Sequence, residues 1–195
     1  MKQRSPAPKT AVATRRALLL IDFFNPLDFE GGAALAGPAL RAARNTARLR
    51  ERLREANVPV IYANDNFKHW ESEFSTLVAK CSEREGVAGT IARLLAPQEG
   101  DRSILKPRHS AFYGTPLEFL LEERDVQTLI LTGIAADSCI SVTAHDAHVR
   151  KFQLWIPSDC VAAEKPAFAR AALTQLARTT HARVTSTATR PPNKI

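Results

Sequence analysis

Three side chains in this sequence have the types that nucleophilic catalysis needs: the thiol of Cys139, the carboxylate of Asp22 and the ammonium of Lys106. Each lies at or just beyond the end of a short apolar run that is typical of a buried strand. A thiol can attack a carbonyl, a carboxylate can take the thiol proton, and a cation can hold the charge of the site while the thiolate forms. The pattern predicts covalent catalysis wherever the fold brings these three side chains together.

Cys139 lies in the stretch LTGIAADSCISVTAHDAHVRK, residues 131–151. The apolar run 129–131 predicts a strand that ends at Gly133, and Asp137 is the expected N-cap of the helix that follows. The first turn of a helix has unpaired N–H groups and the positive end of the helix dipole, which lower a cysteine pKa and favour the thiolate. The alternative is that Cys139 is a small residue that fills a tight strand-to-helix turn.

The loops after the apolar runs supply the expected substrate contacts. Aromatic residues in a loop that also has glycine can line an apolar pocket, or they can pack under the loop as a local cluster. On the first interpretation, the substrate-binding residues are Phe23, Asn25, Phe67, Trp70 and Tyr113. Asp65 and His69 lie close enough in sequence to suggest a metal site, but two ligands fall short of a three-ligand site, so no metal is expected.

Short apolar runs alternate with helical patterns along the chain. Strands are expected at 17–21, 58–63, 103–105, 129–131, 152–156 and 183–186, and helices at 38–56, 86–96, 116–124, 137–149 and 165–180. This alternation predicts a Rossmann-like, three-layer α/β/α fold with a six-stranded, mostly parallel sheet. Ligands bind such sheets at the carboxyl ends of the strands. Asp22, Lys106 and Cys139 are therefore expected at one rim, although Asp22 could instead cap a turn.

Length and cysteine usage favour one domain in a reducing compartment. The 195 residues are expected to comprise a disordered basic lead (1–16), a single folded domain (17–186) and a frayed tail (187–195). The three cysteines are far apart and include no CxxC pair, which argues against a disulfide scaffold. Without an apolar run of membrane-spanning length or a signal-peptide core, the sequence predicts a cytoplasmic protein with no membrane partner.

The net charge of +7 comes from the two ends of the chain. Residues 1–16 include five basic and no acidic residues, residues 165–195 include six and none, and residues 17–164 have a net charge of −4. No zinc-finger spacing and no basic face with interleaved aromatic residues is present, so nucleic acid is not an expected partner.

Four motifs carry a resemblance to a known family. DFFNPLDFEGG, NDNFKHW, LKPRHSAFYGTPLEFLL and TGIAADSCISVTAHDA resemble, in order and spacing, the isochorismatase-like cysteine hydrolase superfamily over residues 17–180. The resemblance implies the strand order 3-2-1-4-5-6, the catalytic triad named above, and a cis peptide bond between Ile134 and Ala135. It also implies that this bond presents backbone N–H groups at Ala135 and Cys139 as an oxyanion hole.

Two departures from the family pattern narrow the expected substrate. The zinc-dependent nicotinamidases of the family have an Asp-x-His motif near the second strand, which NDNFKHW lacks, so nicotinamide is disfavoured. The isochorismatases proper generally lack the nucleophilic cysteine, so Cys139 favours amide or carbamoyl chemistry. Ala136 also replaces a threonine found in many relatives, which removes any hydrogen bond made by that hydroxyl.

The sequence thus predicts a cysteine hydrolase that cleaves the C–N bond of a small amide, ureide or carbamoyl compound through a thioester on Cys139. The resemblance implies a small-molecule substrate and a homo-oligomer, either dimer or tetramer, and no cofactor is expected. One alternative is a vinyl-ether hydrolase that uses Asp22 as its acid. Another is a catalytically silent α/β module that binds a ligand or a partner protein.

Overall fold

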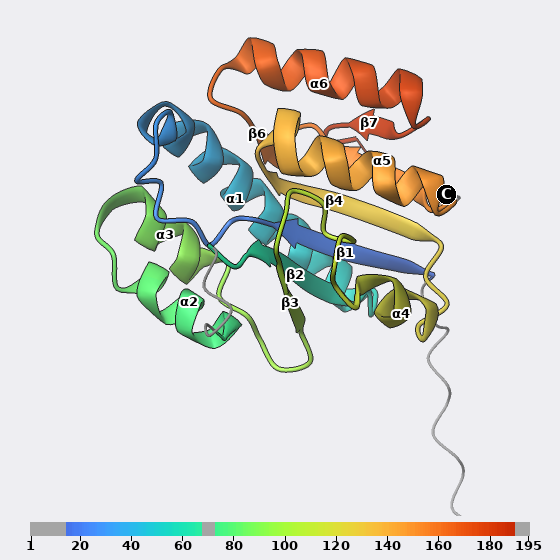
Figure 1. Ribbon diagram of the computed structural model, residues 1–195, viewed down its shortest axis with the longest axis horizontal. Coiled ribbons are helices and arrows are strands. Elements are labelled where there is room, and N and C mark those ends of the chain that lie inside the picture. Colours follow the sequence, from blue (N-terminus) through green and yellow to red (C-terminus); the bar gives the residue numbers. More distant parts are fainter. Residues whose placement is uncertain (1–14, 68–72, 190–195) are drawn as a thin grey trace, which may run out of the picture.

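The apolar runs of the sequence form the strands of one sheet in the computed structural model, which describes residues 15–67 and 73–189. The sheet order is β3-β2-β1-β4-β5-β7, with the two-residue β6 paired to β4 (Figure 1). Every strand pair is parallel. The strands are β1 (Arg16–Ile21), β2 (Val60–Asp65), β3 (Arg102–Lys106), β4 (Thr128–Ile134), β5 (Gln153–Pro157), β6 (Val161–Ala162) and β7 (Arg183–Thr185). The fold class and the order of the six predicted strands are confirmed, and β6 is additional because two residues are too few to show a strand pattern.

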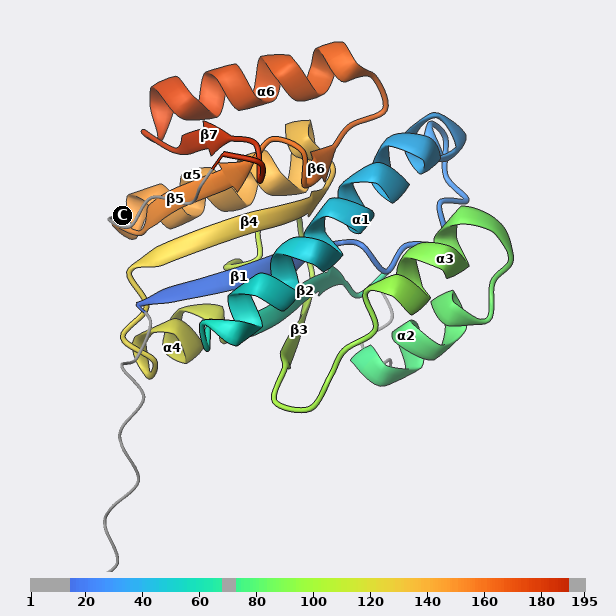
Figure 2. The same cartoon turned by 180° about the vertical axis from the view of Figure 1, so that it is seen from behind.

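Helices cover both faces of the sheet and give three layers. One face is covered by α4, α5 and α6 (Figure 1), and the other by α1 and α3, with α2 beside them (Figure 2). The helices are α1 (Gly32–Glu55), α2 (Phe74–Ser82), α3 (Gly86–Leu94), α4 (Leu117–Glu122), α5 (Ser141–Val149) and α6 (Pro166–Thr179), and a π-helical turn, η1 (Ala136–Ile140), precedes α5. None of these helices has the length and apolar character that crossing a membrane requires.

The position of β1 in the middle of the sheet explains why residues 17–21 are all apolar. Ala17, Leu19 and Ile21 pack into the core cluster that includes α4, α5 and α6 residues. Leu18 and Leu20 pack into the cluster on the α1 side. Because successive side chains point to opposite faces and both faces are covered, every position from Ala17 to Ile21 is buried.

The first helix begins earlier than its sequence suggested. Pro38 was the expected first residue, but α1 starts at Gly32 and Pro38 lies inside it. The six residues before Pro38 include three alanines and a leucine, which are strong helix formers, and Leu35 is buried in the core. Local propensity and burial of Leu35 thus extend the helix across a proline that normally marks a first turn.

Two residues, Arg16 and Thr187, mark the ends of the expected domain in the structure. Strand β1 begins at Arg16, one residue before the expected start of the domain. Thr187, where a frayed tail was expected to begin, is held by the Asp159 carboxylate, which accepts hydrogen bonds from its backbone N–H at 2.8 Å and its hydroxyl at 2.5 Å. Residues 1–14 and 190–195 lie outside the described part of the chain.

Gly133 sets the distance between β1 and β4 where both strands reach the carboxyl edge. Its φ is +134°, and a Cβ added there would lie 2.0 Å from the carbonyl oxygen of Ile21. A side chain at this position would therefore push apart the two strands that lead to Asp22 and Ala135.

We expect Gly133→Ala to lower the free energy of unfolding by at least about 3 kcal/mol, because the backbone clash adds to the strain of the positive φ. Gly100→Ala is the matched control, since Gly100 has φ +88° but no heavy atom within 4 Å of the added Cβ. The control should cost only the strain, about 1 kcal/mol. Urea denaturation of both variants measures the difference, and equal losses would show that the contact with Ile21 is unimportant.

Candidate active site

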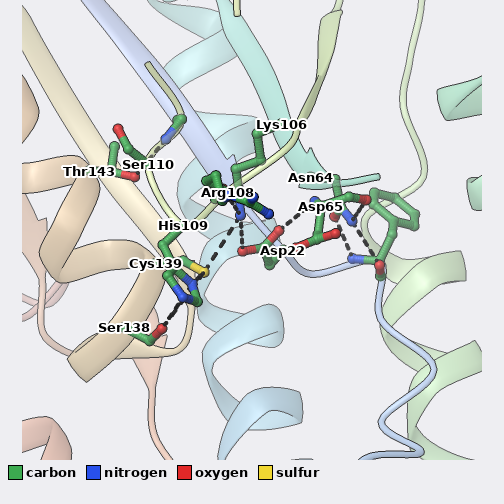
Figure 3. Close-up of polar contacts among 12 residues, drawn as sticks. Asp22, Asn64, Asp65, Lys106, Arg108, His109, Ser110, Ser138, Cys139 and Thr143 are labelled. Atoms are coloured by element: carbon green, nitrogen blue, oxygen red, sulfur yellow. Dashed lines mark hydrogen bonds and ion pairs between the residues drawn. The ribbon is translucent and has the colours of Figure 1, made fainter. Parts of the chain in front are cut away.

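Asp22, Lys106 and Cys139 meet at the carboxyl edge of the sheet (Figure 3). The Nζ atom of Lys106 lies 2.8 Å from Oδ2 of Asp22 and 3.5 Å from Sγ of Cys139. The negative charge of Asp22 also acts on the Cys139 thiol and raises its pKa, after burial, which is the larger cause. The structure thus brings together the three side chains that the sequence singled out.

Strand register explains how side chains from non-adjacent strands reach one another. Asp22 follows β1 with φ +54°, and the backbone N–H of Asp65, in the neighbouring β2, donates a hydrogen bond of 2.7 Å to its Oδ1. Lys106 is the last residue of β3 and is the register partner of Asp65. The Lys106 side chain therefore crosses the end of β2, and it is fully buried along this path.

Cys139 is held in the π-helical turn η1 rather than behind an N-cap at Asp137. Ala135 occupies the capping position with extended backbone, and its carbonyl oxygen accepts hydrogen bonds from the N–H groups of Ser138 (3.1 Å) and Ile140 (3.2 Å). Asp137 lies inside the turn with an exposed side chain, so the expected N-cap was wrong by two residues. The peptide bond between Ile134 and Ala135 is cis, as the resemblance implied.

Burial, rather than the helix terminus, has the largest effect on the pKa of the Cys139 thiol. Burial raises the pKa of Cys139 to about 12, the negative charge of Asp22 adds to this, and Lys106 only partly opposes it. The expectation of a lowered thiol pKa was therefore wrong. The resting site is a thiol beside an ion pair, and the thiol needs a base in contact with it before it can react.

The same buried environment shifts the pKa values of Asp22 and Lys106. Burial raises the pKa of Asp22 above the usual aspartate value, although the Lys106 charge pulls in the other direction. Burial alone would lower the pKa of Lys106, but the adjacent Asp22 carboxylate outweighs burial and raises it. Asp22 is therefore a stronger base than an exposed aspartate, and Lys106 stays cationic.

A cavity of about 330 Å³ opens above these side chains. Asp22 and Cys139 lie on its wall, together with Ala135, the residue after the cis bond. Other lining residues come from the loop after β1, the loop after β3 and the segment before α6, and they include Phe29, His109 and Glu164. The cavity has room for a small molecule next to the thiol.

Only some of the residues that were expected to contact the substrate line this cavity. Asn25 and Phe67 line it. Phe23 does not, because its side chain turns away from Asp22 into the core on the α1 side and is 2% exposed. Tyr113 is 61% exposed and is not among the lining residues, so neither it nor Phe23 is retained as a pocket wall. Trp70 lies outside the described residues.

Asp65 has a structural role at the edge of the cavity. Its Oδ1 accepts a hydrogen bond of 2.5 Å from the backbone N–H of Phe67, which closes the turn after β2. His69, the other residue of the rejected metal pair, lies outside the described residues. Within residues 15–67 and 73–189, no group of three His, Cys, Asp or Glu side chains could hold a metal ion.

His109 is a residue of the site that the sequence reasoning missed. Its Nδ1 lies 3.5 Å from Sγ of Cys139 and 3.4 Å from Oγ of Ser138 (Figure 3). The available signal was a histidine three residues after Lys106, in a loop that also has aromatic residues. Its contact with sulfur could not be inferred from that spacing, because the loop conformation decides it.

The loop that carries His109 is fixed to α5. The backbone N–H of Ala111 donates a 3.0 Å hydrogen bond to Oγ1 of Thr143, and the Ser110 hydroxyl donates a 2.5 Å bond to Asp146. Since α5 continues directly from the turn that holds Cys139, these bonds hold the histidine and the cysteine in one frame.

Comparisons with known proteins agree with this fold and these motifs. A family model described as the isochorismatase domain matches residues 16–189. The uncharacterized isochorismatase family protein YaaI of Bacillus subtilis is 33% identical over 171 residues, which is 88% of this chain and 93% of that protein. The ureidoacrylate amidohydrolase RutB of Stutzerimonas stutzeri is 28% identical over 193 residues, covering 86% of this chain and 77% of that protein.

Among solved structures, nicotinamidase PncA of Bacillus subtilis is similar with a TM-score of 0.70 and 28% identity, over 89% of this chain and 100% of that chain. The family model covers nearly all of the described chain, and YaaI aligns with most of it. On these grounds, the chain belongs to the isochorismatase family.

Proposed function

We propose that this protein is a cysteine hydrolase that cleaves the C–N bond of a small amide, ureide or carbamoyl compound through a thioester on Cys139. The observation that carries the proposal is the position of Sγ beside a cavity and 3.5 Å from Nζ of Lys106, which is ion-paired with Asp22. Relatives named as a ureidoacrylate amidohydrolase and a nicotinamidase support amide hydrolysis as the reaction class.

In the proposed reaction, Asp22 takes the thiol proton as Sγ attacks the carbonyl carbon. This base is necessary because the thiol, with a pKa of about 12, is almost entirely protonated near neutral pH. Lys106 keeps the site electrically balanced while negative charge develops. Backbone N–H groups at Ala135 and Cys139 bind the oxyanion, a role worth about 3 kcal/mol per donor in other enzymes. Water then hydrolyses the thioester.

One observation favours a second reaction. Burial raises the pKa of Asp22, which is also what a general acid for vinyl-ether hydrolysis would need. That reaction has no use for the thiol, whereas Cys139 is in contact with Lys106, the ion-pair partner of the acid in question. The contact favours the cysteine mechanism.

Two experiments test the proposal. A hydrolysis screen over small primary amides, ureides and carbamoyl compounds, read out as released ammonia or amine, should find turnover. Intact-mass analysis after incubation with a thiol-reactive amide analogue should find one adduct, located on Cys139. Turnover of vinyl ethers alone, or ligand binding with neither turnover nor adduct, would contradict the proposal.

The pH dependence of kcat/KM should report the protonation of Asp22. The carboxylate must be unprotonated to accept the thiol proton, so kcat/KM should fall as the pH drops through the raised pKa of Asp22. The acid limb is therefore expected above the ordinary aspartate range near pH 4. Asp137→Asn, at an exposed carboxylate of the same cavity, should keep this limb unchanged. Full activity retained at about pH 4 would contradict the assignment.

The proposal includes the expected assembly as a dimer or tetramer and action in the cytoplasm. Light scattering coupled to size-exclusion chromatography measures the assembly directly. A monomer at micromolar concentration would contradict this part of the proposal and leave the catalytic part intact.

A further inference from the structure

The sulfur of Cys139 has proton-carrying groups on two sides. On the buried side it contacts the Asp22–Lys106 pair, in which Asp22 is 4% and Lys106 0% exposed. On the other side, Nδ1 of His109 lies 3.5 Å from Sγ, and the His109 side chain is exposed and lines the cavity. Sulfur attack uses the first group, but nothing in the reaction so far uses the second.

Amide cleavage has a step that needs such a group. The leaving nitrogen carries the electron pair of the broken C–N bond and must gain a proton, because a free amide anion is a very poor leaving group. In the tetrahedral intermediate, this nitrogen is bonded to the same carbon as Sγ. A ring nitrogen that contacts Sγ from the cavity side is therefore within reach of it.

Asp22 is less well placed for that transfer. Its Oδ1 accepts the backbone N–H of Asp65, and its Oδ2 accepts the Lys106 ammonium, so both oxygens are engaged on the buried side. His109 has its Nδ1 shared between Sγ and the Ser138 hydroxyl. Its Nε2 has no hydrogen-bond partner among the residues that the structure describes.

We propose that His109 is a second catalytic residue, which protonates the leaving amine while Asp22 exchanges its proton only with sulfur. This assignment rests on the proposed amide hydrolysis. Imidazole is the side chain most often used for such transfers.

The proposed reaction has two stages, acylation and deacylation. In acylation, Asp22 takes the thiol proton, the S–C bond forms and the C–N bond breaks. The imidazolium of His109 gives its proton to the nitrogen and becomes neutral. In deacylation, neutral His109 takes a proton from the attacking water, the C–S bond breaks, and the sulfur regains its proton from Asp22. Amide and water are consumed, acid and amine are formed, and both residues return to their starting states.

The test compares two substrates whose leaving groups differ in their need for a proton. The probes are propionamide and phenyl propionate, or the same pair of derivatives of the best acyl group from the amide screen. Phenolate leaves without protonation, whereas ammonia does not. In His109→Gln, kcat/KM for the amide should fall about 100-fold or more, and kcat/KM for the ester should stay within about threefold of wild type.

His148→Gln is the matched control, because His148 lies in the last turn of α5 and does not line this cavity. It should leave both substrates unaffected. In His109→Ala, added imidazole should restore amide turnover in a concentration-dependent way. Circular dichroism verifies that each variant is folded, and His109→Asn replaces His109→Gln if the latter is not.

Two results would overturn the assignment. Equal losses on amide and ester would show that His109 only positions or activates the thiol, and an unchanged amide rate would show that it has no role. In either case Cys139→Ala remains inactive, so the proposed function survives. If wild type and Cys139→Ala hydrolyse neither substrate class, the proposed function itself fails, and this inference fails with it.

Discussion

Replacement of Cys139 by alanine is expected to lower kcat/KM for amide hydrolysis by at least about 10⁴-fold, because it removes the atom that forms the thioester. The fold should be unaffected, since Cys139 is only partly buried and its neighbours Asp22 and Lys106 keep their ion pair. The measurement is steady-state kinetics on the best amide of the screen, with a thermal melt of each variant.

Cys81→Ala provides the matched control. Cys81 is a buried free cysteine in α2 and does not line the cavity beside Cys139. The control should keep wild-type kcat/KM and the single adduct on Cys139. If Cys139→Ala were to retain activity within about tenfold of wild type, the thioester mechanism would be refuted. Vinyl-ether chemistry with Asp22 as acid would then become the leading explanation.

Replacement of Lys106 by methionine is expected to be the most damaging change for both stability and activity. It leaves the Asp22 carboxylate buried without its partner, and breaking a buried ion pair in this way costs about 4 kcal/mol. Amide turnover should also be lost, because the site can no longer balance the charge that develops during sulfur attack. Urea denaturation and steady-state kinetics measure the two effects.

The double variant Asp22→Asn/Lys106→Met separates the two effects. It removes both charges, so most of the lost stability should return while activity stays absent. Arg15→Met is a matched control at the exposed ion pair with Asp125, where the side chains are 54% and 73% exposed. It should cost less than about 1 kcal/mol. A double variant no more stable than Lys106→Met would show that the lost stability comes from packing rather than from an unpaired charge.

The fold was predictable because its signals are local. Residues 17–21 form an uninterrupted apolar run, and only a strand covered on both faces explains it. Once alternating strands and helices are recognised, topology requires that the carboxyl ends of the strands share one rim. That rule placed Asp22, Lys106 and Cys139 together before any distance was known. The extension of α1 before Pro38 was missed because burial of Leu35 is not a local property.

Details of the site depended on contacts between distant segments. Phe23 and Tyr113 were expected at the cavity on residue type alone, but the turn after Asp22 directs Phe23 into the core, and Tyr113 is exposed to solvent. His109 reaches Sγ only because its loop is bonded to Thr143 and Asp146 of α5. A sequence pattern cannot show such bonds, since they join residues about thirty positions apart.

By itself, the sequence determined the α/β class, the strand order through family resemblance, and the identity of the three side chains at the rim, because apolar periodicity and strand ends are encoded residue by residue. Only the tertiary structure decided the protonation of Cys139. A helix terminus favours the thiolate, but burial and the Asp22 charge outweigh it and raise the thiol pKa to about 12. Desolvation depends on everything packed around an atom, and that environment exists only in the folded chain.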